Sequence, residues 1–238
     1  MADLPPPLPP GQRPVGQLVA EAMRLYGANF WRAIPLGIPL AVATEVNLGR
    51  SINVQIAVFA ICAPLFSAAF VRASQIAFGL TPPRRRIVFA WLVGTLVWLP
   101  APPLLRLYVL PGLAWLAFWG LSVPVAVREG LGFKATLGRA RRLAIADFAH
   151  ALGSLCTLVL VVGLSGVFLS ALLHSQGEAT RRTAAFLAPF VLSPLLYLGS
   201  ALLYFDQSAR VGSGRPDADL HSPVEADPAG RSDPQVES

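Results

Sequence analysis

The sequence predicts an all-α, polytopic membrane protein, and three observations lead to this fold class. Hydrophobic residues make up 54% of the 238-residue chain and charged residues only 13%, whereas a soluble domain carries about 25% charged residues. The mean hydropathy is high, at +0.57. Apolar stretches that approach or exceed the roughly 18 residues of a membrane-spanning helix recur along the chain. We therefore expect lipid to surround most of the protein.

Six apolar segments predict about six transmembrane helices. The segments are residues 33–48, 53–73, 87–105, 107–127, 151–173 and 184–205. The first segment is the weakest, because it is short and contains Pro35, Pro39 and Glu45. Prolines also interrupt later segments, and each proline removes a backbone donor and can kink a helix. Kinked packing helices are the favoured interpretation, and broken helices around a transport site are the alternative.

The remaining parts of the chain differ in composition. Residues 1–13 are proline-rich, which predicts a disordered arm. Residues 206–238 hold seven of the thirteen acidic residues and no aromatic residue, which predicts a disordered acidic tail. The transmembrane domain is then residues 14–205. Within it, residues 15–30 form an amphipathic pattern that predicts an interfacial helix.

The distribution of positive charge predicts the orientation. Lys and Arg are enriched in cytoplasmic loops. With six spans and the N-terminus inside, 15 of the 19 Lys and Arg residues fall on the cytoplasmic side. If the first segment did not span, this bias would reverse, so the charges support that segment as a span. We predict a multi-pass protein of the cell inner (cytoplasmic) membrane with both termini in the cytoplasm.

Residues 131–148 predict a second interfacial helix, which carries a basic face. Its expected apolar stripe is Phe133, Leu137, Ala140, Ala144 and Phe148. The basic residues around that stripe are Lys134, Arg139, Arg141 and Arg142. Anionic lipids attract such a face by about 1 kcal/mol per basic residue. Three interpretations stay open: charges that only fix the topology, a site for anionic lipid headgroups, and a docking surface for a partner protein.

The sequence offers no strong sign of catalysis, and we expect neither a cofactor nor a metal. It contains no HExxH, P-loop, GxSxG or CxxC motif, and Cys62 and Cys156 lie in apolar runs. Asp147 and His150 could serve as a base for a nucleophile such as Ser154, but a cap of the fifth predicted span explains their spacing better. We expect no nucleic-acid binding, because the membrane context explains the basic charge.

Charged residues near helix ends predict local ion pairs. Glu129 has Lys134 nearby in the sequence, and Asp206 has Arg210. Glu45 and Arg72 are ionisable residues within predicted spans, which makes them functional candidates by default. Both lie near segment ends, so we favour a surface pair of Glu45 with Arg50 and snorkelling of the long side chains.

Three short motifs resemble a known family. They are a Leu-Tyr-x-x-Asn-Phe stretch after the first amphipathic segment, a Pro-x-x-x-x-Glu-Gly exit from a span, and a Leu-Tyr-Tyr-Asp-like end of the last span. The matching residues are Tyr26, Asn29, Phe30, Pro124, Glu129, Gly130, Tyr204 and Asp206. In these motifs the chain resembles a bacterial integral membrane family that is similar to the membrane domain of glycerophosphoryl diester phosphodiesterase.

This resemblance covers residues 14–210 and implies a six-helix membrane protein in which the motif residues are structural. The diesterase chemistry of the fusion proteins belongs to a separate soluble domain with a cluster of His, Glu and Asp. This chain has three widely separated histidines, so the resemblance does not imply that activity. We expect a non-enzymatic scaffold or regulatory protein whose basic surface engages anionic lipid or a partner. A transporter or permease subunit is the alternative.

Overall fold

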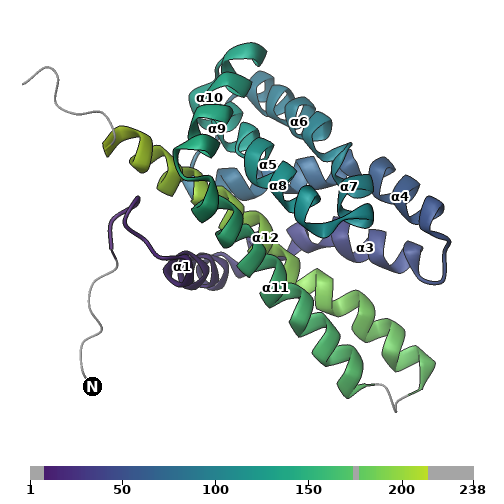
Figure 1. Ribbon diagram of the computed structural model, residues 1–238. Coiled ribbons are helices and arrows are strands. Elements are labelled where there is room, and N and C mark those ends of the chain that lie inside the picture. The colour runs from purple at the N-terminus through teal and green to yellow at the C-terminus, as the bar shows by residue number, and fades with distance from the viewer. Residues whose placement is uncertain (1–7, 174–176, 214–238) are drawn as a thin grey trace, which may run out of the picture.

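The computed structural model describes residues 8–173 and 177–213, whose regular elements are all helices, with no strand among them (Figure 1). The elements are α1 (Val15–Ala28), α2 (Phe30–Ala33), η1 (Ile34–Gly37), α3 (Ile38–Asn47), α4 (Ile52–Ile61), α5 (Ala63–Phe78), α6 (Arg84–Trp98), α7 (Ala101–Leu107), α8 (Val109–Trp119), α9 (Ser122–Glu129), α10 (Phe133–Ala146), α11 (Phe148–Leu172) and α12 (Glu178–Ser213). The predicted all-α class is confirmed.

The described residues contain four helical stretches that are long and apolar enough to cross a membrane. They are Arg84–Leu105, Val109–Glu129, Phe148–Leu169 and Arg182–Gly212. The pair α4–α5 makes a fifth if its two helices, bent by 48° at the break, form one span. These helices are compatible with a membrane protein, but the predicted count of about six is not confirmed.

The difference lies in the first predicted span, residues 33–48. Here the chain forms three short helices, α2, η1 and α3, instead of one long helix. Pro35 and Pro39 each lack the N–H that a continuous helix needs. Gly37 lies so close to the carbonyl of Phe190 in α12 that a Cβ atom there would overlap it. Pro194, four residues after Phe190, has no N–H and cannot donate to that carbonyl as a helical residue normally does. The interruption of the helix near Gly37 therefore lets this segment pack closely against the backbone of α12.

The last helix is longer than expected. α12 has 36 residues and therefore extends over about 54 Å. Residues 206–213 belong to it, which corrects the prediction that the disordered tail begins at residue 206. The physical reason is that Asp206 and Gln207 are fully buried against other helices. Residues 214–238 of the predicted tail lie outside the described residues.

The N-terminal arm also differs from the expectation in its described part. Residues 8–13 lie against the end of α12, where a Cβ atom on Gly11 would come within 3.1 Å of the Ala209 side chain. The Nε atom of Arg13 donates to the carbonyl of Leu8 over 3.1 Å. Residues 1–7 lie outside the described residues.

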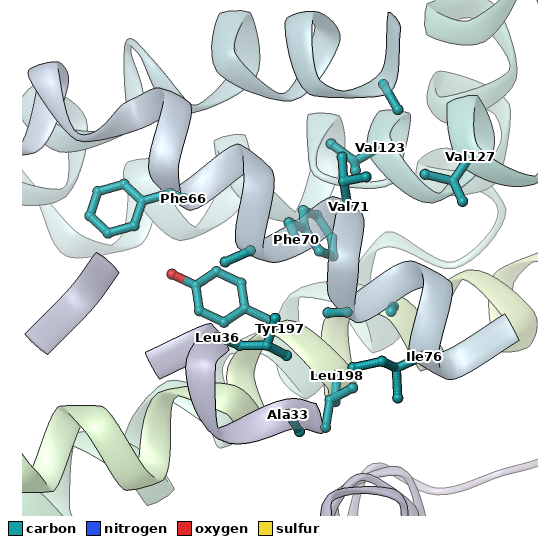
Figure 2. Packing of buried hydrophobic residues seen from close by; sticks show 14 of the residues in the cluster. Ala33, Leu36, Phe66, Phe70, Val71, Ile76, Val123, Val127, Tyr197 and Leu198 are labelled. Atoms are coloured by element: carbon teal, nitrogen blue, oxygen red, sulfur yellow. The ribbon is translucent and has the colours of Figure 1, made fainter. Parts of the chain in front are cut away.

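Two large apolar clusters hold the helices together. The first joins η1, α5, α6, α9 and α12, with Phe70, Val71, Val123 and Leu198 among its buried residues (Figure 2). The second joins α1, α9, α10 and α12 through residues such as Leu18 and Leu143. Apolar burial of this kind contributes about 25 cal/mol per Å² in water, whereas close packing carries more of the association within lipid.

Much apolar surface remains exposed. The α11–α12 hairpin extends away from the other helices (Figure 1), and Leu164 and Phe168 on α11 are 62% and 71% exposed. Contiguous exposed apolar surface marks contact with a membrane or another protein. The exposed side of α11 is therefore suited to contact with lipid tails.

Candidate functional site

Most of the described charged side chains meet at one end of the bundle. Here α1 and α6 begin, α9 and α12 end, and α10 crosses between α9 and α11. Three long-range contacts join these elements: Arg13 with Asp206, Glu129 with Tyr204, and Asp147 with Arg210. We call this region the charged end.

Helix α10 turns a different side to the bundle than its sequence predicts. Its buried residues are Thr136, Ala140, Leu143 and Ala144. Of the predicted apolar stripe, only Ala140 and Ala144 are buried, and Phe133 is 45% exposed. Thr136 can face inward because its hydroxyl donates to the carbonyl of Leu131 over 3.1 Å. The side of α10 that faces the bundle therefore includes Thr136, whose buried hydroxyl is hydrogen-bonded to the Leu131 carbonyl.

The four basic residues of α10 separate into two groups. Lys134, Arg141 and Arg142 are exposed, and within the described chain they form no ion pair. Arg139 instead turns inward, and its Nε atom lies 3.1 Å from Oε1 of Glu129. The predicted pair of Glu129 with Lys134 is therefore replaced by Glu129 with Arg139.

Glu129 is the centre of a small polar network. The hydroxyl of Tyr204 donates to Oε1 of Glu129 over 2.8 Å, so two motif residues from α9 and α12 are in direct contact. Gly130 ends α9 with a φ of +65°, a left-handed conformation that favours glycine. The guanidinium of Arg86 from α6 occupies the space where a Cβ atom on Gly130 would lie.

Arg128, next to Glu129, makes cation–π contacts. Its guanidinium carbon lies 5.6 Å from the ring centroid of Phe78 and 5.4 Å from that of Phe205. Such contacts contribute about 0.5–1 kcal/mol each at exposed sites. They connect the ends of α5, α9 and α12.

A second network surrounds the fully buried Asp206. Nη1 of Arg13 lies 3.4 Å from Oδ1 of Asp206 and 2.7 Å from Oε2 of Glu21. Nε2 of His150 lies 3.8 Å from Oδ2 of Asp206, beyond hydrogen-bonding distance. Arg210, the predicted partner of Asp206, pairs with Asp147 instead, at 2.6 Å.

Asp147 has the capping role that the sequence predicts. Its Oδ1 atom accepts a hydrogen bond from the backbone N–H of His150 over 3.0 Å, at the N-cap of α11. Gln207 adds a bond from its side-chain amide to the carbonyl of Asp147, at 3.1 Å. The favoured interpretation of the Asp147 and His150 spacing is confirmed.

Several polar atoms of α11 and α12 are buried without a hydrogen-bond partner within the described chain. Among them are Oδ2 of Asp206, Nε2 of His150, Oε1 of Gln207 and Oγ of Ser154. An unpaired buried polar atom costs about 1–3 kcal/mol. The described residues contain no group of three or more His, Cys, Asp or Glu that could hold a metal. The network joins α1 to α11 and α12.

The other motif residues lie at two further places. At the corner between α1 and α2, the hydroxyl of Tyr26 donates to the carbonyl of Val191 over 2.9 Å, and burial raises the pKa of Tyr26. The side-chain amide of Asn29 donates to the carbonyl of Leu25, and Phe30 packs on Tyr26 with ring centroids 5.5 Å apart. Pro124 is buried within α9.

Glu45 and Arg72 are the two ionisable residues within the predicted spans. The predicted surface pair of Glu45 and Arg50 is not formed among the described residues, and Oε2 of Glu45 is buried without a hydrogen-bond partner. Arg72 is exposed and donates to the side chain of Gln75 over 3.1 Å.

Comparison with known proteins gives no relative: no protein-family model, curated protein or solved structure matches the chain. The family resemblance of the three motifs is therefore still a prediction. The described contacts place Glu129 beside Tyr204, and Tyr26 beside Phe30.

Proposed function

We propose that the protein is a non-enzymatic scaffold or regulatory protein of the inner membrane that engages anionic phospholipid headgroups. The observation that carries this proposal is the exposed basic face of the charged end. We define the basic face as Arg84, Arg85, Lys134, Arg141 and Arg142, all of which are exposed.

The basic residues at the start of α6 and those on α10 lie close together in the fold. Arg86 follows Arg84 and Arg85 at the start of α6, and it lies against Gly130, just before α10. Each basic residue near a membrane surface adds about 1 kcal/mol of attraction to anionic lipid. Because α10 buries its opposite side in the bundle, its basic side is free to contact headgroups.

The proposal includes a topology with six crossings and the charged end in the cytoplasm. The contact of Arg13 with Asp206 supports an even number of crossings, because both ends of the described chain then lie on one side. In this topology α2, η1 and α3 together form the first crossing. The excess of Lys and Arg at the charged end agrees with the cytoplasmic preference of these residues.

Native mass spectrometry in a mild detergent tests the proposal. The protein is titrated with phosphatidylglycerol and, separately, with phosphatidylcholine. We expect preferential binding of phosphatidylglycerol, and we expect replacement of Lys134, Arg141 and Arg142 by Gln to weaken it by about tenfold or more.

Arg139→Gln is the matched control on the same helix, because Arg139 pairs inward with Glu129. This variant should bind phosphatidylglycerol almost as the wild type does. Equal affinity of the triple variant and the wild type would contradict the lipid proposal. A protein partner that co-purifies only with the wild type would assign the basic face to docking instead.

A transporter or permease subunit is the second candidate. The bend of 48° between α4 and α5 favours it, because broken helices surround the substrate in many transporters. Transport assays in proteoliposomes test this candidate, with flux of a solute as the supporting result.

A further inference from the structure

An apolar pocket lies inside the bundle, away from the basic face. Its volume is about 320 Å³, within the range of about 300–1,000 Å³ that is typical of small-molecule sites. Helices α3 to α8, α11 and α12 supply its walls. In the described part of the chain, no charged side chain lines the pocket.

Four aromatic rings form one continuous wall of this pocket. Phe59 stacks on Phe66 with ring centroids 5.9 Å apart, Phe66 lies 5.4 Å from Trp98, and Trp98 lies 6.4 Å from Tyr197. The rings come from four helices, α4, α5, α6 and α12. Leucines such as Leu113 and Leu155 complete the lining. This surface fits a hydrocarbon body.

Tyr197 provides a polar group in this apolar surface. The residue is only 5% exposed, and its hydroxyl forms no hydrogen bond within the described chain. Figure 2 shows the hydroxyl directed toward Phe66, and both residues line the pocket. Because the hydroxyl borders an otherwise apolar pocket, it is available to donate to a ligand that carries an acceptor oxygen.

Helix α4 provides a route into the pocket from the side. None of its residues is buried, although Gln55, Ile56 and Phe59 line the pocket. Its outward residues are also exposed, with Val54 at 43%. For a protein surrounded by lipid, a ligand that enters past α4 comes from the membrane.

We propose that this pocket binds a neutral, membrane-soluble molecule with a hydrocarbon body and at least one carbonyl oxygen. The lack of charged lining residues selects for a neutral ligand, because an ionised group would be desolvated without a counter-charge. The carbonyl accepts the hydrogen bond of the Tyr197 hydroxyl. A fatty ester and a quinone with an aliphatic tail both have this chemistry. The basic face takes no part in this binding.

Fluorescence quenching of the full chain in detergent tests the proposal. The first probe is the methyl ester of dibrominated stearic acid, and the second is a benzoquinone with a decyl tail. Both quench tryptophan at short range, and Trp98 is part of the pocket wall. We expect saturable quenching that is lost in Trp98→Phe. The probe that binds more tightly identifies the ester or the quinone as the ligand class.

The Tyr197→Phe variant tests the hydrogen bond. It should bind the tighter probe about fivefold more weakly and a dibrominated alkane unchanged. Tyr108→Phe is the control, because Tyr108 is 73% exposed and outside the pocket. Quenching without saturation, or equal carbonyl-probe affinity in Tyr197→Phe and the wild type, would overturn the proposal.

A second pair of variants tests the pocket if Tyr197→Phe does not fold. Ile56→Phe adds volume inside the pocket, whereas Val54→Phe adds it on the outer side of the same helix. We expect about a tenfold loss of probe affinity in Ile56→Phe alone. An equal affinity in both variants would contradict the site.

Discussion

Nη1 of Arg210 lies 2.6 Å from Oδ2 of Asp147, 63 residues away, and joins the last turns of α12 to the N-cap of α11. The other carboxylate oxygen of Asp147 caps α11. One side chain thus serves two structural roles at the charged end, and substitutions can separate them.

Asp147→Ala removes the cap and the ion pair together, whereas Asp147→Asn keeps a capping oxygen and removes the charge. Both variants lose the ion pair with Arg210, so they differ in the cap, whose loss costs about 1 kcal/mol. We therefore expect Asp147→Ala to lower the free energy of unfolding by about 1 kcal/mol more than Asp147→Asn does. Denaturant unfolding in detergent measures both, and equal values would show that the cap contributes nothing.

Arg13→Gln should release the described N-terminal segment from α12. It removes a cation 3.4 Å from the buried Oδ1 of Asp206 and 2.7 Å from Glu21. We expect faster amide hydrogen exchange in α1 and a loss of about 1–3 kcal/mol in stability. Arg24→Gln, at an exposed position on α1, is the control. Unchanged exchange in Arg13→Gln would show that the contact does not hold α1 in place.

Tyr204→Phe removes only the hydroxyl that donates to Glu129. One neutral donor to a charged acceptor contributes about 1.5–3 kcal/mol, so stability should fall by about that amount. Thermal unfolding detects the change, with Tyr108→Phe as a matched substitution at an exposed site. A variant as stable as the wild type would mean that Glu129 is satisfied by Arg139 alone.

Gly130→Ala should be destabilising for two reasons. The φ of +65° favours glycine, and the new Cβ atom would come within 2.7 Å of Nε of Arg86. We expect a loss of about 1–2 kcal/mol. Gly138→Ala, where a Cβ atom meets nothing within 4 Å, should instead stabilise α10 slightly. The opposite order in unfolding experiments would contradict the described end of α9.

Local patterns predicted the helices well but not the partners of the charged residues. The apolar segments near α6, α8, α11 and α12, and the cap at Asp147, could be found from composition and spacing. The contact of Arg13 with Asp206 joins residues 193 positions apart, and no local spacing encodes it. The sequence predicts pairs between opposite charges that are near each other along the chain. In the fold, a different opposite charge lies closer in space.

The first span and the orientation of α10 show the same limit. Residues 33–48 are apolar, but Gly37 must fit the Phe190 carbonyl, which only the tertiary arrangement reveals. Thr136 is polar by type, yet it is buried because Leu131 offers an acceptor. In both cases a contact with a backbone carbonyl accompanies the difference between the predicted and the observed local structure.

The proposed function requires that the charged end faces the cytoplasm, and cysteine labelling shows which side of the membrane it faces. Single cysteines at Ser51 and Ala135, both exposed, are introduced into a chain with Cys62 and Cys156 replaced by Ser. A membrane-impermeant maleimide is then applied to whole cells before and after the membrane is made permeable. We predict that the cysteine at position 51 reacts from outside and that the cysteine at position 135 reacts only after permeabilisation. Reaction of the cysteine at position 135 from outside would place the basic face away from the cytoplasm and contradict the proposed function.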